Sequence, residues 1–295
     1  MPPKNLGALE RPKDPRDILL GSVQAPVQIP TLFIPDVRSW LQRNYQGQTP
    51  FCGEHAGTHL KVILDNAAST AIGRKSPRYG AVKLKSPSSP VYDGFAIDAG
   101  TTMTAVFKWL EKVGADDYAP LENDVTLPLA TYCEPSAVTP VMDANAAISL
   151  ISSYAFGGTD FTSLCQAIYQ NKAVILLIKC DEGFWGTATP TFTTPTYGHF
   201  VVAYGYDAEG IYVVDSADPN NEFAFKHILA QYITPMFFFE AGTAIDLPPT
   251  VKKALTTNTP VPASVTHALS TGQLSLAGQI LQDIEAALAL IQKEI

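Results

Sequence analysis

A cysteine, a histidine and an aspartate occupy positions in this sequence from which they could carry out nucleophilic chemistry. Cys52 follows a loop-like stretch and directly precedes residues 54–68, whose apolar side chains recur at helical spacing. The sequence therefore predicts Cys52 at or near a helix N-terminus, where free N–H groups and the helix dipole stabilise a thiolate. The alternative is a small buried cysteine without chemistry, which is what most cysteines are.

His199 and Asp215 lie far downstream, at the same end of a predicted β-hairpin. Residues 200–206 and 210–214 are strand-like apolar runs on either side of a short turn. Because the two strands of a hairpin run in opposite directions, His199 and Asp215 are expected to meet at its open end. A histidine there could take a proton from a thiol and later protonate a leaving amine. The aspartate could hold the imidazole ring in place.

Together these positions resemble the papain-like cysteine proteases. The resemblance rests on Gln46 upstream of Cys52, on Gly198-His199 before an apolar strand, and on the polar Asp215 beyond that strand. In this family the nucleophile and its downstream partners lie roughly 130 to 150 residues apart. Other Cys–His enzymes, such as NlpC/P60-type amidases and transglutaminases, keep the same order, but their histidine usually comes sooner.

The resemblance implies a role for each matching residue. Cys52 would form an acyl-thioester with a peptide substrate, and His199 would act as base and acid. Asp215, where the family usually has asparagine, would orient the histidine. Gln46 would donate a hydrogen bond to the oxyanion, with Gln48 as the competing candidate. Three small residues are expected to bind the substrate: Ala99, Gly100 and Gly198.

Three departures from the family pattern leave a second interpretation open. Gly53 replaces the usual tryptophan or small apolar residue, and no tryptophan follows Asp215 to shield its hydrogen bond with the histidine. Glu54 places a carboxylate beside the nucleophile and is expected to point outward, because an inward charge would oppose a thiolate. The alternative function is a catalytically retired papain-like structural or interaction module, for instance in a virus particle. Acyl transfer to an amine is a third possibility.

The resemblance implies a papain-like α+β fold, in which a helical lobe and an antiparallel β-sheet lobe enclose an active-site cleft. Helices are expected over 54–68, 100–113, 143–156 and 162–170, and residues 69–96 are expected to form a surface excursion. The predicted organisation is an extended N-terminal arm (1–30), a protease domain (31–244) with a helical lobe at roughly 46–170 and a sheet lobe at roughly 171–244, a linker (245–270), and a C-terminal amphipathic helix (271–295).

Bulk composition narrows the class further. A chain of 295 residues with 46% hydrophobic residues can bury a large core, and a net charge of −8 argues against nucleic-acid binding. We expect neither a membrane span nor a signal peptide, which leaves a cytoplasmic or virion-associated location. No cofactor or metal is expected, because the four cysteines form no CxxC pair and His55 and His59 lack a third ligand. The expected partners are a protein or peptide substrate and a docking or self-association surface on the C-terminal helix.

Overall fold

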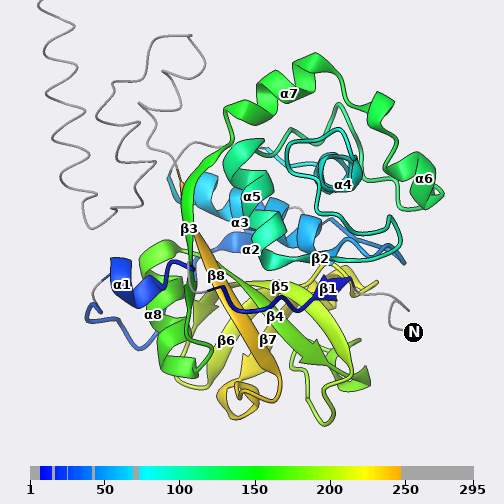
Figure 1. Cartoon of the computed structure of the whole chain (residues 1–295). Coiled ribbons are helices and arrows are strands. Elements are labelled where there is room, and N and C mark those ends of the chain that lie inside the picture. The colour runs from blue at the N-terminus through cyan, green and yellow to red at the C-terminus, as the bar shows by residue number, and fades with distance from the viewer. Residues whose placement is uncertain (1–6, 15–16, 25, 42–43, 69–72, 247–295) are drawn as a thin grey trace, which may run out of the picture.

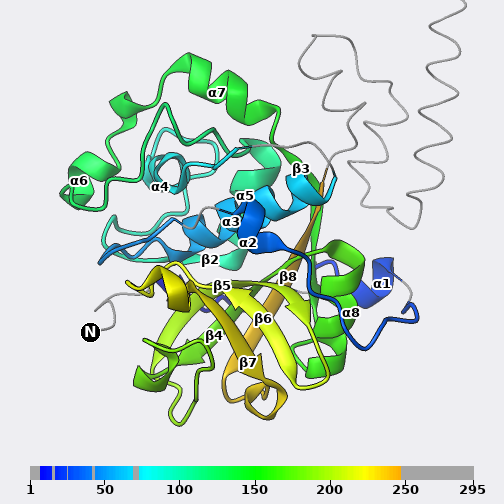
Figure 2. The same cartoon turned by 180° about the vertical axis from the view of Figure 1, so that it is seen from behind.

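The chain folds into a helical layer and a sheet layer that pack against each other (Figure 1). The computed structural model describes residues 7–14, 17–24, 26–41, 44–68 and 73–246. Figure 2 shows the same two layers from behind, with the last long helix beside the sheet. This arrangement confirms the predicted α+β class and the papain-like lobe architecture.

Helices dominate the first half of the chain and strands the second half. The helices are α1 (Leu20–Val23), α2 (Val37–Trp40), α3 (Cys52–Ala67), α4 (Pro77–Lys85), α5 (Met103–Lys112), α6 (Leu129–Tyr132), α7 (Pro140–Ala147) and α8 (Phe161–Asn171). The strands are β1 (Ala8–Leu9), β2 (Thr101–Thr102), β3 (Ile151–Gly157), β4 (Val174–Cys180), β5 (Tyr197–Tyr206), β6 (Gly210–Val214), β7 (Phe225–Leu229) and β8 (Phe238–Asp246). None of the described helices is long and apolar enough to cross a membrane.

Helix α3 is the centre of the helical lobe and carries Cys52 at its first position. Every residue from Cys52 to Asp65 is buried, since α4 and α5 pack against α3 from one lobe and β5 from the other. Charged side chains are buried as well. Lys61 and Asp65 form an ion pair of 2.5 Å, and neither side chain is exposed. The helix predicted over residues 54–68 is confirmed.

In the described part of the chain, the sheet lobe holds six antiparallel strands in the order β3-β8-β4-β5-β6-β7. Strands β5 and β6 form the predicted hairpin, in which Val202 pairs with Val214 and Tyr206 with Ile211. Helix α8 packs Leu164 and Ile168 into the apolar core of the sheet. The hairpin fixes where His199 and Asp215 lie relative to each other.

The stretch 69–96 is not only a surface excursion, because it contains helix α4. Ser76 caps the helix by accepting a hydrogen bond from the Tyr79 N–H, and Pro77 occupies the first turn. Tyr79 is completely buried in the helical lobe. The composition of this stretch suggested a loop, but packing of one helical face against α3 and α5 stabilises the helix.

The helix predicted over 143–156 is wrong in its second half. Helix α7 ends at Ala147, and Ile151–Gly157 form strand β3, which pairs antiparallel with β8. Because β3 and α8 pack with the sheet, the sheet lobe begins near residue 151 and not at 171. Partner strands distant in sequence decide the conformation here.

The described part of the N-terminal arm runs across the boundary between the two lobes. Strand β1 pairs in parallel with β2, Ala8 opposite Thr101 and Leu9 opposite Thr102. Figure 1 shows this dark-blue segment between the helices and the sheet. The C-terminal helix predicted at 271–295, its docking role and all but the start of the linker predicted at 245–270 lie outside the described residues.

Candidate active site

His199 and Asp215 meet at the open end of the hairpin, as the sequence predicted. Nε2 of His199 lies 2.8 Å from Oδ1 of Asp215, and both side chains are completely buried. The same oxygen accepts a hydrogen bond of 2.8 Å from the Ala217 N–H. Burial raises the pKa of Asp215, but the His199 hydrogen bond and charge and the Lys226 ammonium outweigh it, so the pKa lies below its usual value. Asp215 is therefore a carboxylate that holds the imidazole ring.

Cys52 lies against the strand that carries His199. The backbone N–H groups of Phe200 and Gly53 hydrogen-bond to the sulfur and favour its thiolate. Nδ1 of His199, the ring nitrogen that Asp215 does not use, is buried and has no hydrogen-bond partner. Complete burial nevertheless raises the pKa of Cys52 above its usual value, and the charges of Glu54 and Asp215 raise it further. In this structure Cys52 is therefore a thiol.

Glu54 points inward, and the predicted outward orientation is wrong. Its side chain is completely buried, and neither carboxylate oxygen has a hydrogen-bond partner. Burial raises the pKa of Glu54 to about 7, although the nearby Lys85 ammonium opposes the shift. The carboxyl group is therefore protonated in a large fraction of molecules at neutral pH, which limits its repulsion of a Cys52 thiolate.

This raised pKa predicts a pH-dependent stability. Between the unfolded value of 4.5 and the folded value of about 7, the folded state holds a proton that the unfolded state releases, so stability falls as pH rises. Glu54→Gln removes this loss and should raise the free energy of unfolding at pH 8 by about 2 to 3 kcal/mol, with little effect at pH 5. Urea denaturation at both pH values measures it. The control is Glu122→Gln at an exposed carboxylate, and equal changes in both variants would contradict the assignment.

Trp185 covers the histidine, so the expected loss of shielding is wrong. Its ring packs edge-on against His199 with centroids 5.6 Å apart, and Phe184 packs at 6.0 Å. The second position after Asp215 holds Ala217 instead. The loop before β5 therefore supplies the tryptophan that is absent after Asp215.

Gln46 is buried and connects the loop before α3 to the end of the hairpin. Its Oε1 accepts a hydrogen bond of 2.7 Å from the Ser216 hydroxyl, and its Nε2 donates at 3.0 Å to the Thr49 carbonyl. The backbone N–H of Gln46 also donates to the Ser216 carbonyl at 2.9 Å. One amide hydrogen of Gln46 is thus engaged and the amide is held in one orientation. Gln48, the competing candidate, is exposed.

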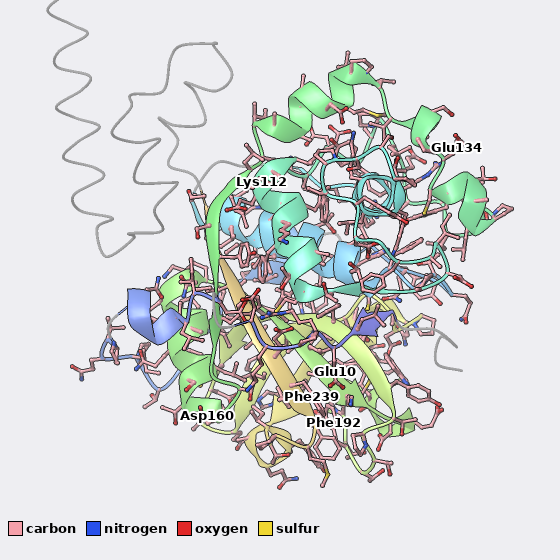
Figure 3. All side chains as sticks on the ribbon, viewed as in Figure 1. Glu10, Lys112, Glu134, Asp160, Phe192 and Phe239 are labelled. Atoms are coloured by element: carbon pink, nitrogen blue, oxygen red, sulfur yellow. The ribbon has the colours of Figure 1, made fainter. Side chains whose placement is uncertain are left out.

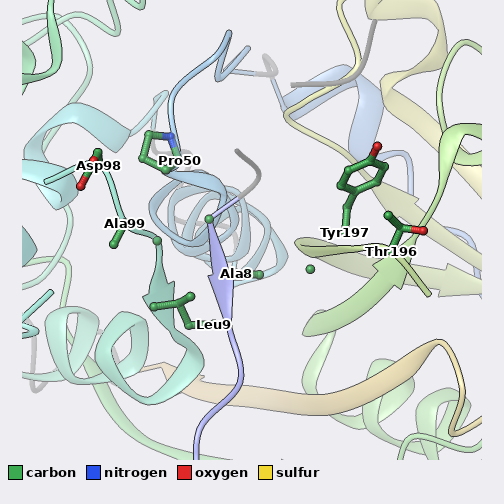
Figure 4. A pocket seen from close by; sticks show the side chains of 10 residues that line it. Ala8, Leu9, Pro50, Asp98, Ala99, Thr196 and Tyr197 are labelled. Atoms are coloured by element: carbon green, nitrogen blue, oxygen red, sulfur yellow. The ribbon is translucent and has the colours of Figure 1, made fainter. Parts of the chain in front are cut away.

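The N-terminal arm passes between the three residues predicted to bind substrate. A cavity of about 300 Å³ is lined by Ala99, Gly100 and Gly198 together with Gly7, Ala8 and Leu9 of the arm. Figure 4 shows Ala8 and Leu9 between the Asp98-Ala99 segment and the Thr196-Tyr197 segment. The arm therefore lies along the surface to which a substrate was expected to bind.

The approach of the arm is so close that only glycine fits beside it. A Cβ atom on Gly100 would lie 1.5 Å from the Gly7 carbonyl oxygen, and one on Gly198 would lie 2.7 Å from the Ala8 carbonyl oxygen. The Thr101 N–H donates to the Gly7 carbonyl at 2.8 Å. Thr101 therefore provides the backbone pairing, while Gly100 provides the space for it.

Charged side chains anchor the arm beyond the strand pairing. Arg11 forms ion pairs of 2.7 Å with Glu240 and 2.8 Å with Asp17 and lies over the Phe156 ring. Glu10 forms an ion pair with Lys179 of β4. Lys179 also lies over the ring of Phe239, and Figure 3 labels Glu10 and Phe239 near each other over the sheet.

Other departures from the family pattern have structural reasons. A Cβ atom on Gly53 would lie 2.5 Å from Thr101 Cγ2 of β2 and 2.9 Å from Val106 Cγ2 of α5, so these close contacts favour glycine. His55 and His59 are buried, and each hydrogen-bonds to the backbone of Asn44. They are structural residues that hold the loop before α3.

Sequence reasoning missed Lys226, a buried lysine next to the candidate dyad. Its Nζ lies 3.7 Å from Oδ2 of Asp215 and 2.9 Å from Oδ2 of Asp218. The available signal was alternation, since residue 226 shares a face of β7 with the buried Ile228. A lysine at an inward-facing strand position requires a buried counter-charge.

Comparison with known proteins agrees with this geometry. The model of the Peptidase_C39 like family matches residues 130–234, which include His199 and Asp215 but not Cys52. A search of curated protein sequences found no significant match.

Several solved cysteine proteases have the same fold. Xylellain, a cysteine protease from Xylella fastidiosa, is 14% identical with a TM-score of 0.66, covering 84% of this chain and 98% of that one. Digestive procathepsin L 3 of Tenebrio molitor is 16% identical with a TM-score of 0.58, covering 78% and 74%. The Carica candamarcensis cysteine protease CMS1MS2 is 13% identical with a TM-score of 0.55, covering 75% and 100%. These structures show that the chain has the papain-like fold, and the family model matches the segment that carries His199 and Asp215.

Proposed function

We propose that this protein is a cysteine peptidase that hydrolyses peptide bonds through an acyl-thioester on Cys52. The observation that carries the proposal is the seat of the N-terminal arm. An extended backbone already lies beside Gly100 and Gly198 and pairs with Thr101 through a main-chain hydrogen bond. Addition of a strand in this way is a common mode of peptide recognition, because main-chain hydrogen bonds form with peptides of many different sequences. A peptide substrate would take the place of the arm.

The proposed reaction uses the two ends of one imidazole ring. Nδ1 of His199 takes the proton from Cys52, and the sulfur attacks the carbonyl carbon of the scissile bond. Asp215 stabilises the imidazolium through its hydrogen bond with Nε2. The proton on Nδ1 is then transferred to the departing amine. The Cys52 backbone N–H and the Gln46 amide are the proposed oxyanion donors. Water then attacks the thioester, with His199 acting as base, and releases the acid.

The alternative, a retired scaffold, is favoured by two observations on Cys52. Its thiol is completely buried, and the buried Glu54, two positions further along α3, adds an opposing charge. In a retired scaffold these features would persist in every conformation. In a latent peptidase, burial ends when the arm leaves. Cys52 reactivity distinguishes the two.

The test combines alkylation with a cleavage assay on the full chain and on the protein lacking residues 1–9. Brief treatment with dilute iodoacetamide at pH 7 should modify Cys52 before the other buried cysteines, Cys133, Cys165 and Cys180, because Cys52 is the one that the proposal pairs with a histidine. Incubation with a diverse peptide mixture should give new N-termini by mass spectrometry, and Cys52→Ala should abolish them. Slow, equal labelling of all four cysteines with no cleavage in both proteins would refute peptidase function. Products coupled to an added amine would instead indicate acyl transfer.

A further inference from the structure

The buried carboxylate of Asp215 is only half used by the histidine. Its Oδ1 accepts hydrogen bonds from His199 and Ala217, whereas Oδ2 is buried and accepts none. A buried carboxylate without compensation on one oxygen readily becomes protonated. A protonated Asp215 would no longer stabilise an imidazolium. The His199 hydrogen bond favours the ionised form, and a permanent positive charge beside Oδ2 would stabilise it further.

Lys226 is the group placed to do so. Its ammonium lies 3.7 Å from the unused Oδ2 of Asp215, and the side chain is completely buried. The other groups with an electrostatic effect on Asp215 are His199 from β5 and the thiols of Cys52 and Cys180 from α3 and β4. Lys226 is the cation among them that needs no proton from the reaction. A positive charge at this distance lowers the pKa of a carboxyl group.

The same lysine also fixes the loop that covers the histidine. Its Nζ donates to the Thr187 carbonyl at 3.1 Å and to Asp218 at 2.9 Å. Oδ2 of Asp218 in turn accepts a hydrogen bond of 2.8 Å from the Gly186 N–H. The two residues that follow Trp185 are thus held by one ion pair, and Trp185 packs on His199. The Lys226–Asp218 ion pair therefore holds the loop that carries Trp185, and Trp185 covers His199.

We propose that Lys226 is a positioning residue for the candidate dyad, which keeps Asp215 ionised and, with Asp218, holds Trp185 over His199. The catalytic role of Lys226 rests on the proposed function. The test does not, because it measures the protonation of Asp215 and not peptide cleavage. Papain-like proteases usually have a neutral asparagine, which needs no counter-charge, at the position of Asp215, and a tryptophan shortly after it. This sequence has neither. Lys226 supplies the charge, and the Lys226–Asp218 pair supplies the tether.

The test follows the His199–Asp215 hydrogen bond in the full chain as pH falls. The buried Nε2–H of His199 should give a downfield, slowly exchanging proton signal in NMR, which disappears when Asp215 is protonated. In Lys226→Met the midpoint of this loss should move up by about one pH unit. Lys226→Arg, which keeps the charge, should retain the wild-type midpoint. In an Asp215→Asn background, Lys226→Met should cause no shift, because the amide does not titrate.

A second variant moves the midpoint the other way and guards against misfolding of Lys226→Met. Asp218→Asn removes the competing carboxylate, so the Lys226 charge acts on Asp215 alone and the midpoint should move to lower pH. An unmoved midpoint in Lys226→Met and Asp218→Asn would overturn the inference. A Lys226→Met shift that persists in the Asp215→Asn background would overturn it as well.

The alkylation rate of Cys52, measured on the same samples, separates this result from the function. If the midpoints move as expected but Cys52 never reacts selectively, Lys226 positions Asp215 in a protein that is not a peptidase. If Cys52 reacts selectively and the pH midpoint is the same in the wild type and the variants, the peptidase proposal stands and the role of Lys226 is rejected. All these variants keep the same arm, so their relative rates are comparable.

Discussion

Deletion of residues 1–9 is expected to raise both peptide hydrolysis and Cys52 alkylation at least about tenfold. The deletion removes β1, whose Ala8 and Leu9 pair with Thr101 and Thr102. A tethered segment competes with substrate at an effective concentration in the millimolar range, so a substrate at micromolar concentration rarely displaces it. Arg11 and its ion pairs with Asp17 and Glu240 remain in the shortened chain and maintain packing around the start of the arm.

The matched control is deletion of residues 1–6, which keeps the strand. This variant should resemble the full chain in activity and in alkylation rate. A synthetic peptide spanning Gly7 to Asp14, added to the shortened protein, should inhibit it competitively. Equal activity of the two deletions, with both proteins folded by circular dichroism, would show that the arm is not an inhibitor.

Replacement of His199 by alanine should lower kcat/KM for peptide cleavage by at least about 10³-fold in the protein lacking residues 1–9. Without the imidazole, nothing takes the proton from a thiol whose pKa burial has already raised. The cost is smaller for Asp215→Asn, because an amide oxygen still accepts the hydrogen bond from Nε2. Steady-state kinetics with a peptide found in the cleavage assay measures both variants.

The matched control for His199→Ala is His227→Ala. His227 stacks on Tyr212 and hydrogen-bonds to Asp207 at 3.2 Å, at the opposite end of the hairpin from Asp215. Its removal should leave kcat/KM within about threefold of the parent, because it contacts none of the candidate catalytic residues. Comparable losses in the two variants would mean that His199 acts through stability, and the proposed mechanism would be rejected.

Local patterns in the sequence predicted the elements that carry the candidate chemistry. The apolar spacing after Cys52 indicated α3 because one helix repeat was clear over four turns. The two apolar runs around residues 207–210 indicated the β5–β6 hairpin, since a hairpin depends on residues close in sequence. The proximity of His199 and Asp215 followed from that hairpin alone.

Other features depend on contacts between distant parts of the chain. Strand β3 pairs with β8, almost the last described segment, and its own residues could also have formed a helix. The burial of Glu54 arises because helices and the sheet together surround α3, so even its polar positions have no access to water. A helical repeat shows which face is most apolar but not whether the opposite face is also covered.

The amino-acid sequence by itself located the candidate catalytic residues Cys52, His199 and Asp215, because each adjoins a local element with a recognisable repeat. Only the tertiary structure placed the arm between Gly100 and Gly198, Trp185 over the histidine and Lys226 beside Asp215. Each of these contacts joins segments that are remote in sequence and adopt no distinctive local pattern. Their positions follow from the packing of the two lobes, which no single stretch of the chain encodes.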